Sequence, residues 1–141
     1  MKGIVAKVAI DVQAPTSKVW DALVKPELIA KYMFGAKVVS DWKEGSPITW
    51  AGEWKGKPYE DKGQILKIQQ GKLLEYSHYS PLTGAPDVPE SYHTVSIELA
   101  EATGATKVTL FQDNNPNEEA RQQSEQNWKH MLEGLKKTVE R

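Results

Sequence analysis

The chain has 141 residues, the length of one typical domain, so it can bury a core without disulfide or metal cross-links and we expect a single domain over residues 1–141. It contains no cysteine, which excludes disulfides, thiolate metal sites and cysteine nucleophiles and favours a reducing compartment. The net charge is −1 with both signs interspersed, which excludes the basic surface expected of a nucleic-acid-binding protein. Since no apolar run fits a signal peptide or a bilayer span, we expect a cytoplasmic protein without membrane insertion.

The first third of the chain predicts one strand followed by two short helices. Apolar and polar residues alternate over residues 4–12, which is typical of a strand. A helix with an apolar stripe is expected after Pro15, because proline and the hydroxyl residues that follow it are helix-start signals. A second short helix begins at Pro26 and ends at Gly35.

The middle of the chain is rich in predicted strands. A loop with three prolines separates them over residues 81–89. Strands in succession with the helices kept apart from them indicate an α+β fold, in which helices pack on one face of an antiparallel sheet. The predicted strands cover residues 38–39, 48–54, 63–68, 73–79, 95–99 and 108–110.

A long helix is predicted over residues 116–140, with Asn115 as its N-cap. We expect Trp128, Leu132 and Leu135 to pack on the inner face of the last two strands. They belong to an apolar stripe at helical spacing that comprises Trp128, Met131, Leu132, Leu135 and Val139. Before Trp128 the same face carries small or polar residues, so space should remain between this part of the helix and the sheet. The alternative is that these positions face water. The small or polar residues are Ala120, Ser124 and Asn127.

Several short motifs in a fixed order span nearly the whole chain: Ala14-Pro15, Val19–Leu23, Pro26–Leu28, Glu44–Ser46, Gly63–Ile68, Leu73–Ser77, Gly104–Leu110 and a closing pattern of Trp128, Leu132, Leu135, Val139 and Glu140. In these motifs the chain resembles the SRPBCC (START-like) superfamily, close to the C-terminal domain of the heat-shock ATPase activators. It departs from the family pattern at Asn127, where the family has glycine, and over residues 31–35, where the family has a tryptophan-rich turn. The resemblance implies a helix-grip fold: a curved antiparallel sheet of about seven strands around a long C-terminal helix, with a cavity between them.

Aromatic residues on the predicted strands suit either a pocket wall or an ordinary core. Trp50 and Trp54 share one face of their strand with Gly52, which would leave a gap between the two indoles. Tyr76 and Tyr92 could each point a hydroxyl into the cavity to orient a polar group. The alternative places both hydroxyls at the rim.

Two histidines flank the proline-rich loop on strands that we expect to pair. His78 and His93 could together form a metal half-site or a general base, but we favour polar strand ends hydrogen-bonded to the loop. Because no third ligand stands at a metal-binding spacing, we expect no metal and no cofactor. Glu53, Glu60 and Asp61 lie near sheet edges, and the pattern indicates no catalytic partner for any of them.

The resulting hypothesis is a non-catalytic domain that binds or carries a small apolar or amphipathic molecule. The alternatives are a cyclase- or hydrolase-type enzyme acting in the same cavity and, by resemblance only, a chaperone-associated interaction module. No catalytic residue is assigned, and the sequence leaves the ligand, the oligomeric state and the pathway open. The predicted pocket consists of Trp50, Trp54, Tyr76, His78, Tyr92 and His93 from the sheet, Tyr32, Met33 and Phe34 at its mouth, and Ala120, Ser124 and Asn127 from the helix.

Overall fold

The computed structural model describes residues 1–140, apart from the side chain of Trp54. The elements follow the predicted order of a strand, two short helices, six further strands and a long helix. They are β1 (Ile4–Val12), α1 (Thr16–Val24), α2 (Pro26–Tyr32), β2 (Lys37–Ser40), β3 (Pro47–Trp54), β4 (Lys57–Gln69), β5 (Leu73–His78), the 3₁₀ turns η1 (Pro81–Thr83) and η2 (Pro89–Ser91), β6 (His93–Ala102), β7 (Ala105–Asn115) and α3 (Glu118–Val139).

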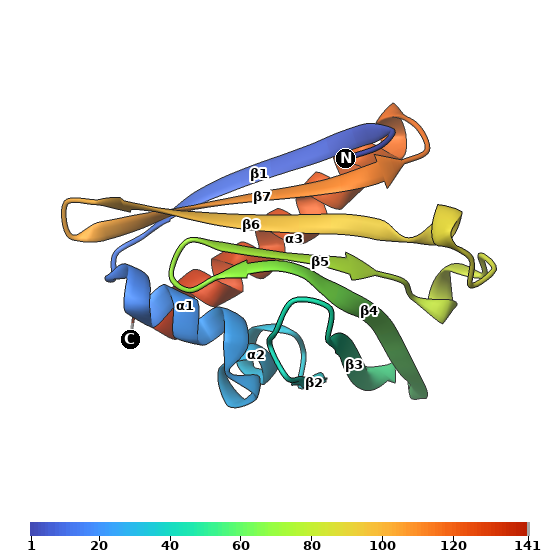
Figure 1. The fold of residues 1–141 in the computed structure, drawn as a ribbon, viewed down its shortest axis with the longest axis horizontal. Coiled ribbons are helices and arrows are strands. Elements are labelled where there is room, and N and C mark those ends of the chain that lie inside the picture. The colour runs from blue at the N-terminus through green and yellow to red at the C-terminus, as the bar shows by residue number, and fades with distance from the viewer. Residues whose placement is uncertain (141) are drawn as a thin grey trace.

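The seven strands form one antiparallel sheet in the order β1-β7-β6-β5-β4-β3-β2. Figure 1 shows α3 running across one face of this curved sheet, with α1 and α2 beside its C-terminal end. The α+β helix-grip fold predicted from the sequence is thereby confirmed.

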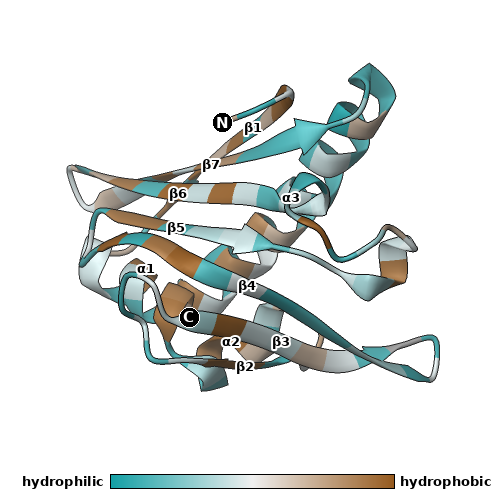
Figure 2. Cartoon of the chain, turned by 45° about the vertical axis from the view of Figure 1, so that its right-hand side comes forward, coloured by the Kyte–Doolittle hydropathy of each residue, from teal (hydrophilic) through white to brown (hydrophobic). Residues whose placement is uncertain are grey.

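The core forms where the C-terminal half of α3 meets the sheet. Leu132 and Leu135 are fully buried, and they belong to one apolar cluster with Ile97 of β6 and with Val108 and Leu110 of β7. The apolar alternation of the last two strands and the apolar stripe of the helix therefore face each other as predicted. In Figure 2 the turns of α3 that extend past the sheet are hydrophilic, in contrast to the half of the helix that packs in the core.

Helix α3 also covers the free edge of β1. The backbone N–H of Lys7 in β1 donates to Glu125 Oε2 of α3 at 3.0 Å, and just past the ends of the two elements the backbone N–H of Gln13 donates to Oε2 of the C-cap residue Glu140 at 2.7 Å. These side chains satisfy backbone donors that an edge strand otherwise leaves to solvent or to another chain. These hydrogen bonds hold one side of α3 close to β1, and the opposite side of α3 faces strands β3, β4 and β5.

The start of α3 differs from the prediction. Its N-cap is Asn117, whose side chain accepts a hydrogen bond from the Ala120 backbone N–H at 2.8 Å. Asn115, the predicted cap, is still part of β7, where it pairs with Ile4. Its side-chain amide donates to the Ile4 carbonyl at 2.9 Å, so the sheet holds Asn115 and the helix begins two residues later.

Candidate functional site

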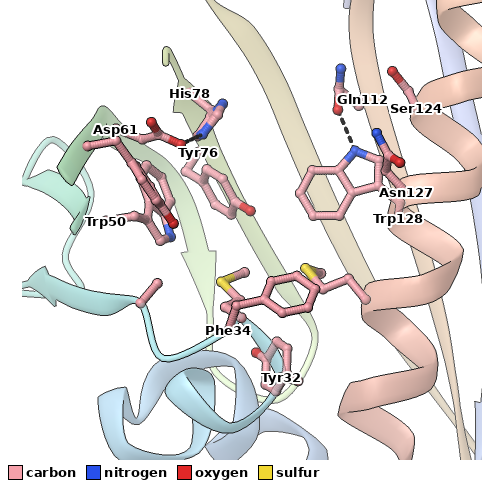
Figure 3. A pocket seen from close by; sticks show the side chains of 14 residues that line it. Tyr32, Phe34, Trp50, Asp61, Tyr76, His78, Gln112, Ser124, Asn127 and Trp128 are labelled. Atoms are coloured by element: carbon pink, nitrogen blue, oxygen red, sulfur yellow. Dashed lines mark hydrogen bonds and ion pairs between the residues drawn. The ribbon is translucent and has the colours of Figure 1, made fainter. Parts of the chain in front are cut away.

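A cavity of about 330 Å³ lies between the middle of α3 and the inner face of strands β3, β4 and β5. The sheet supplies one wall, α3 supplies the opposite wall, and the segment after α2 borders the mouth (Figure 3). The lining residues are Tyr32, Met33, Phe34, Ala36, Trp50, Tyr59, Asp61, Tyr76, His78, Gln112, Ser124, Asn127, Trp128 and Met131.

The sheet wall is built around Trp50, which is 6% exposed. Its ring centroid lies 5.2 Å from that of Tyr76, and its indole packs at 67° against the ring of His78, 5.0 Å away. Burial raises the pKa of Tyr76 well above its ordinary value, so its hydroxyl stays protonated and can donate a hydrogen bond. In Figure 3 this hydroxyl points into the space between sheet and helix.

Asp61 and His78 form a pair at one end of the cavity. Asp61 lies opposite Trp50 in the β3–β4 ladder, and its Oδ2 is 2.9 Å from His78 Nε2. Because a carboxylate only accepts, this contact places the hydrogen of a neutral His78 on Nε2 and leaves Nδ1 as an acceptor. Asp61 Oδ1 is buried and has no hydrogen-bond partner among the described residues.

Tyr59 occupies the place where the sequence predicted a gap. It stands opposite Gly52, and a Cβ on that glycine would lie only 2.9 Å from the Tyr59 hydroxyl oxygen. The ring therefore covers the bare backbone, as aromatic residues often do across a strand pair from glycine. Burial raises the pKa of Tyr59, and the negative charge of Asp61 raises it further.

The helix wall consists of side chains from the middle of α3. Trp128 is half-buried, and its indole N–H donates to Oε1 of Gln112 on β7. This residue was predicted to anchor the core. It packs against the core cluster but is only partly buried, and its other side lines the cavity. Ser124 Oγ donates to Asn115 Oδ1 at 2.8 Å, which ties the first part of this wall to the sheet.

The mouth is bordered by the end of α2 and the residues that follow. Tyr32 is buried and donates its hydroxyl hydrogen to the Ala22 carbonyl at 2.5 Å. Gly134 of α3 allows α2 to come close, since a Cβ there would lie 3.1 Å from the Tyr32 Cβ. Phe34 has a φ of 55°, is 82% exposed and stacks on His130 with centroids 6.4 Å apart.

Eight of the twelve predicted pocket residues line this cavity: Trp50, Tyr76, His78, Tyr32, Met33, Phe34, Ser124 and Asn127. Ala120 lies one turn too early on α3, and the side chain of Trp54 lies outside the described residues.

His93 and Tyr92 have other partners. His93 pairs with His78 in the ladder, as predicted, but its Nδ1 contacts the Asp113 carbonyl at 2.9 Å. Tyr92 donates to Asp87 Oδ1 at 2.7 Å and stacks on Tyr79.

Sequence reasoning missed Tyr59, Asp61 and Gln112 as lining residues. The first two were not assigned to the pocket because the fourth strand was predicted to start at Gly63, whereas β4 starts at Lys57. With the correct start, the period of two places both side chains on the inner face that also carries the buried Ile65. The sequence contained this signal. It also contained one for Gln112, which shares the parity of Val108 and Leu110 but lies beyond the strand predicted over residues 108–110. Asp61, for which the sequence pattern indicated no partner, pairs with His78.

The described residues contain no group of three histidine, aspartate or glutamate side chains arranged to hold a metal ion. None of the helices in the described part of the chain is long and apolar enough to cross a membrane.

Comparison with known proteins identifies relatives of the whole chain. Residues 13–140 match the family model described as Activator of Hsp90 ATPase homolog 1-like protein. A Cytophaga hutchinsonii protein, known from its solution structure, is 56% identical, with 99% of this chain and 97% of that chain covered and a TM-score of 0.87.

More distant structures share the fold alone. The Aha1 dimer from Colwellia psychrerythraea is 18% identical, with 97% and 96% coverage of the two chains and a TM-score of 0.75. CalU16 from Micromonospora echinospora is 18% identical, with 98% and 85% coverage and a TM-score of 0.73. No curated protein matches the chain.

Proposed function

Because the chain belongs to the Activator of Hsp90 ATPase homolog 1-like family, and because its fold leaves a lined space between sheet and helix, we propose that it binds a small, mainly apolar molecule in that cavity. The observation that carries the proposal is the cavity itself. Its volume of about 330 Å³ falls in the range of small-molecule sites, which combine apolar and aromatic walls with a few polar groups.

The arrangement of the walls supports binding of a ligand with some shape specificity. Trp50 and Tyr76 are held by mutual packing, and Trp128 is held by its hydrogen bond to Gln112, so these rings require little reordering when a ligand enters. Met33 and Met131 are flexible apolar side chains that can adapt to the ligand.

The test fills the cavity from the helix. Ser124→Trp should abolish binding of an apolar fluorophore while leaving the circular dichroism spectrum unchanged. Asn127→Trp is the second variant, because Ser124→Trp also removes the hydrogen bond to Asn115. The matched control is Gln122→Trp, about 200° away around the helix from Ser124, which should bind normally. Unchanged binding by both folded cavity variants would refute the site.

A second candidate function is favoured by the pair formed by Asp61 and His78. A carboxylate that fixes the tautomer of an imidazole is the arrangement of a general base, with His78 Nδ1 as the proton acceptor. This candidate predicts turnover of ester or cyclisation substrates that is lost in His78→Gln and weakened in Asp61→Asn. The binding function predicts no such turnover and intact ligand binding in His78→Gln.

A further inference from the structure

Among the described residues, the lining of the cavity contains a carboxylate but no lysine or arginine to balance it. Asp61 is the only carboxylate among the described lining residues, His78 is the only other titratable group besides tyrosine, and neither lysine nor arginine is present. The whole chain has 18 basic and 19 acidic residues, so the composition does not explain this absence. With His78 neutral, the wall therefore carries a net negative charge.

The field of Asp61 reaches into the cavity. Its carboxylate is one cause of the raised pKa of Tyr59, after burial, so the charge is felt by a neighbouring lining residue. The contact with His78 occupies only Oδ2, and Oδ1 has no hydrogen-bond partner in the described part of the chain. The neutral donors in the wall, such as the Tyr76 hydroxyl, can hold an oxygen atom of a ligand but cannot offset this charge.

The aromatic rings that line the cavity also favour a positive charge over a negative one. The face of an aromatic ring is negative and attracts cations, most strongly where water is excluded. Trp50 and Tyr76 are buried, and Trp128 extends toward them from the opposite wall in Figure 3. The six aromatic lining residues are Tyr32, Phe34, Trp50, Tyr59, Tyr76 and Trp128.

We propose that the ligand of this cavity carries a positive charge: an ammonium group on an apolar, preferably aromatic, body. A carboxylate ligand such as a fatty acid is disfavoured, because it would bring a second negative charge toward Asp61, whose side chain is only 15% exposed to the water that would screen it. This inference rests on the proposed binding function and adds to it the chemical class of the ligand.

Three matched compounds test the inference: trimethyl(2-naphthylmethyl)ammonium, neutral 2-naphthalenemethanol and anionic 2-naphthoate. Their affinities are measured by calorimetry at pH 8, above the ordinary range of imidazole titration. The cation should bind at least about tenfold more tightly than the anion, with the neutral compound between them. Shifts of the Trp50 and Trp128 indole N–H signals in NMR spectra should place the bound ring in the cavity.

Asp61→Asn keeps an acceptor for His78 and removes the charge, so the ratio between cation and anion should fall to about threefold or less. Glu60→Gln is the matched control, because Glu60 is the adjacent residue of β4 and is exposed to solvent. The control should keep the full ratio. An anion that binds as tightly as the cation, or a ratio that survives Asp61→Asn, would overturn the inference while leaving the binding function intact. Failure of all three compounds to bind would overturn both.

Discussion

Replacing Leu132 by alanine should destabilise the protein more than replacing the larger Trp128 by alanine. Leu132 is fully buried where α3 meets the sheet. Removing three carbon atoms costs about 2 kcal/mol of lost burial, and the cavity left behind adds about 1–2 kcal/mol. The expected loss in the free energy of unfolding is therefore about 3–4 kcal/mol.

Trp128 is half-buried beside a space that already exists, so its removal widens a cavity instead of creating one. A buried tryptophan costs about 3–5 kcal/mol when truncated to alanine. Half of that range, which includes about 1 kcal/mol for the hydrogen bond to Gln112, gives an expected loss of about 2 kcal/mol.

Urea denaturation followed by circular dichroism measures both losses, and it avoids the change in fluorescence that Trp128→Ala itself causes. For a chain of 141 residues the entropy of unfolding near 60 °C is about 0.3 kcal/mol per kelvin, so Leu132→Ala should lower Tm by about 10 °C. Glu133→Ala, at an exposed position of the same helix, is the control and should change little. If Trp128→Ala costs as much as Leu132→Ala, then the indole belongs to the core and the cavity is misplaced.

Three further measurements test the frame around the cavity. Gly63→Ala should cost at least about 2 kcal/mol in urea denaturation, because its Cβ would lie 1.7 Å from the Ser77 carbonyl oxygen; a near-neutral result would show that β5 does not approach as described. Asn117→Ala should lower the free energy of unfolding by about 1 kcal/mol through loss of the helix cap, and an unchanged free energy would show that Asn117 is not the N-cap of α3. The Lys62 ammonium lowers the pKa of Asp87, so this pair stabilises the fold above the ordinary carboxyl range, and the stability is lost as the pH falls below about 4. The urea midpoint of Asp87→Asn should therefore fall less steeply on acidification than that of the parent protein, and parallel curves would contradict the pairing.

The order of the elements was predictable because each signal for it is local. Alternation in β6 and β7 and the spacing of Leu132 and Leu135 in α3 need no knowledge of distant residues. The start of α3 shows the limit of such signals. Asn115 and Asn117 both suit an N-cap in sequence, and the choice between them is made by the pairing of Asn115 with Ile4 on a strand more than a hundred residues earlier.

The site was harder to predict than the fold for the same reason. The contact between Asp61 and His78 depends on the register of β4 against β5, which shifts between Ile65 and Lys67. That register is set by the pairing of two strands, and the sequence pattern of a single strand does not contain it. For Trp50 and Tyr76 the alternation of residues along each strand was enough to predict that their side chains line the cavity.

The strand order has a consequence for how the chain is made. Among the seven strands that the structure describes, β1 is synthesised first, yet its only partner among them is β7, which begins at Ala105. At a translation speed of about 5–20 residues per second, β1 waits roughly 5–20 s before its partner leaves the ribosome. Closing so long a loop is also slow in the complete chain, since pairing of distant segments lowers folding rates. The edge that α3 covers in the finished molecule is thus the last to be protected, and during synthesis β1 is the segment most exposed to pairing with a neighbouring nascent chain.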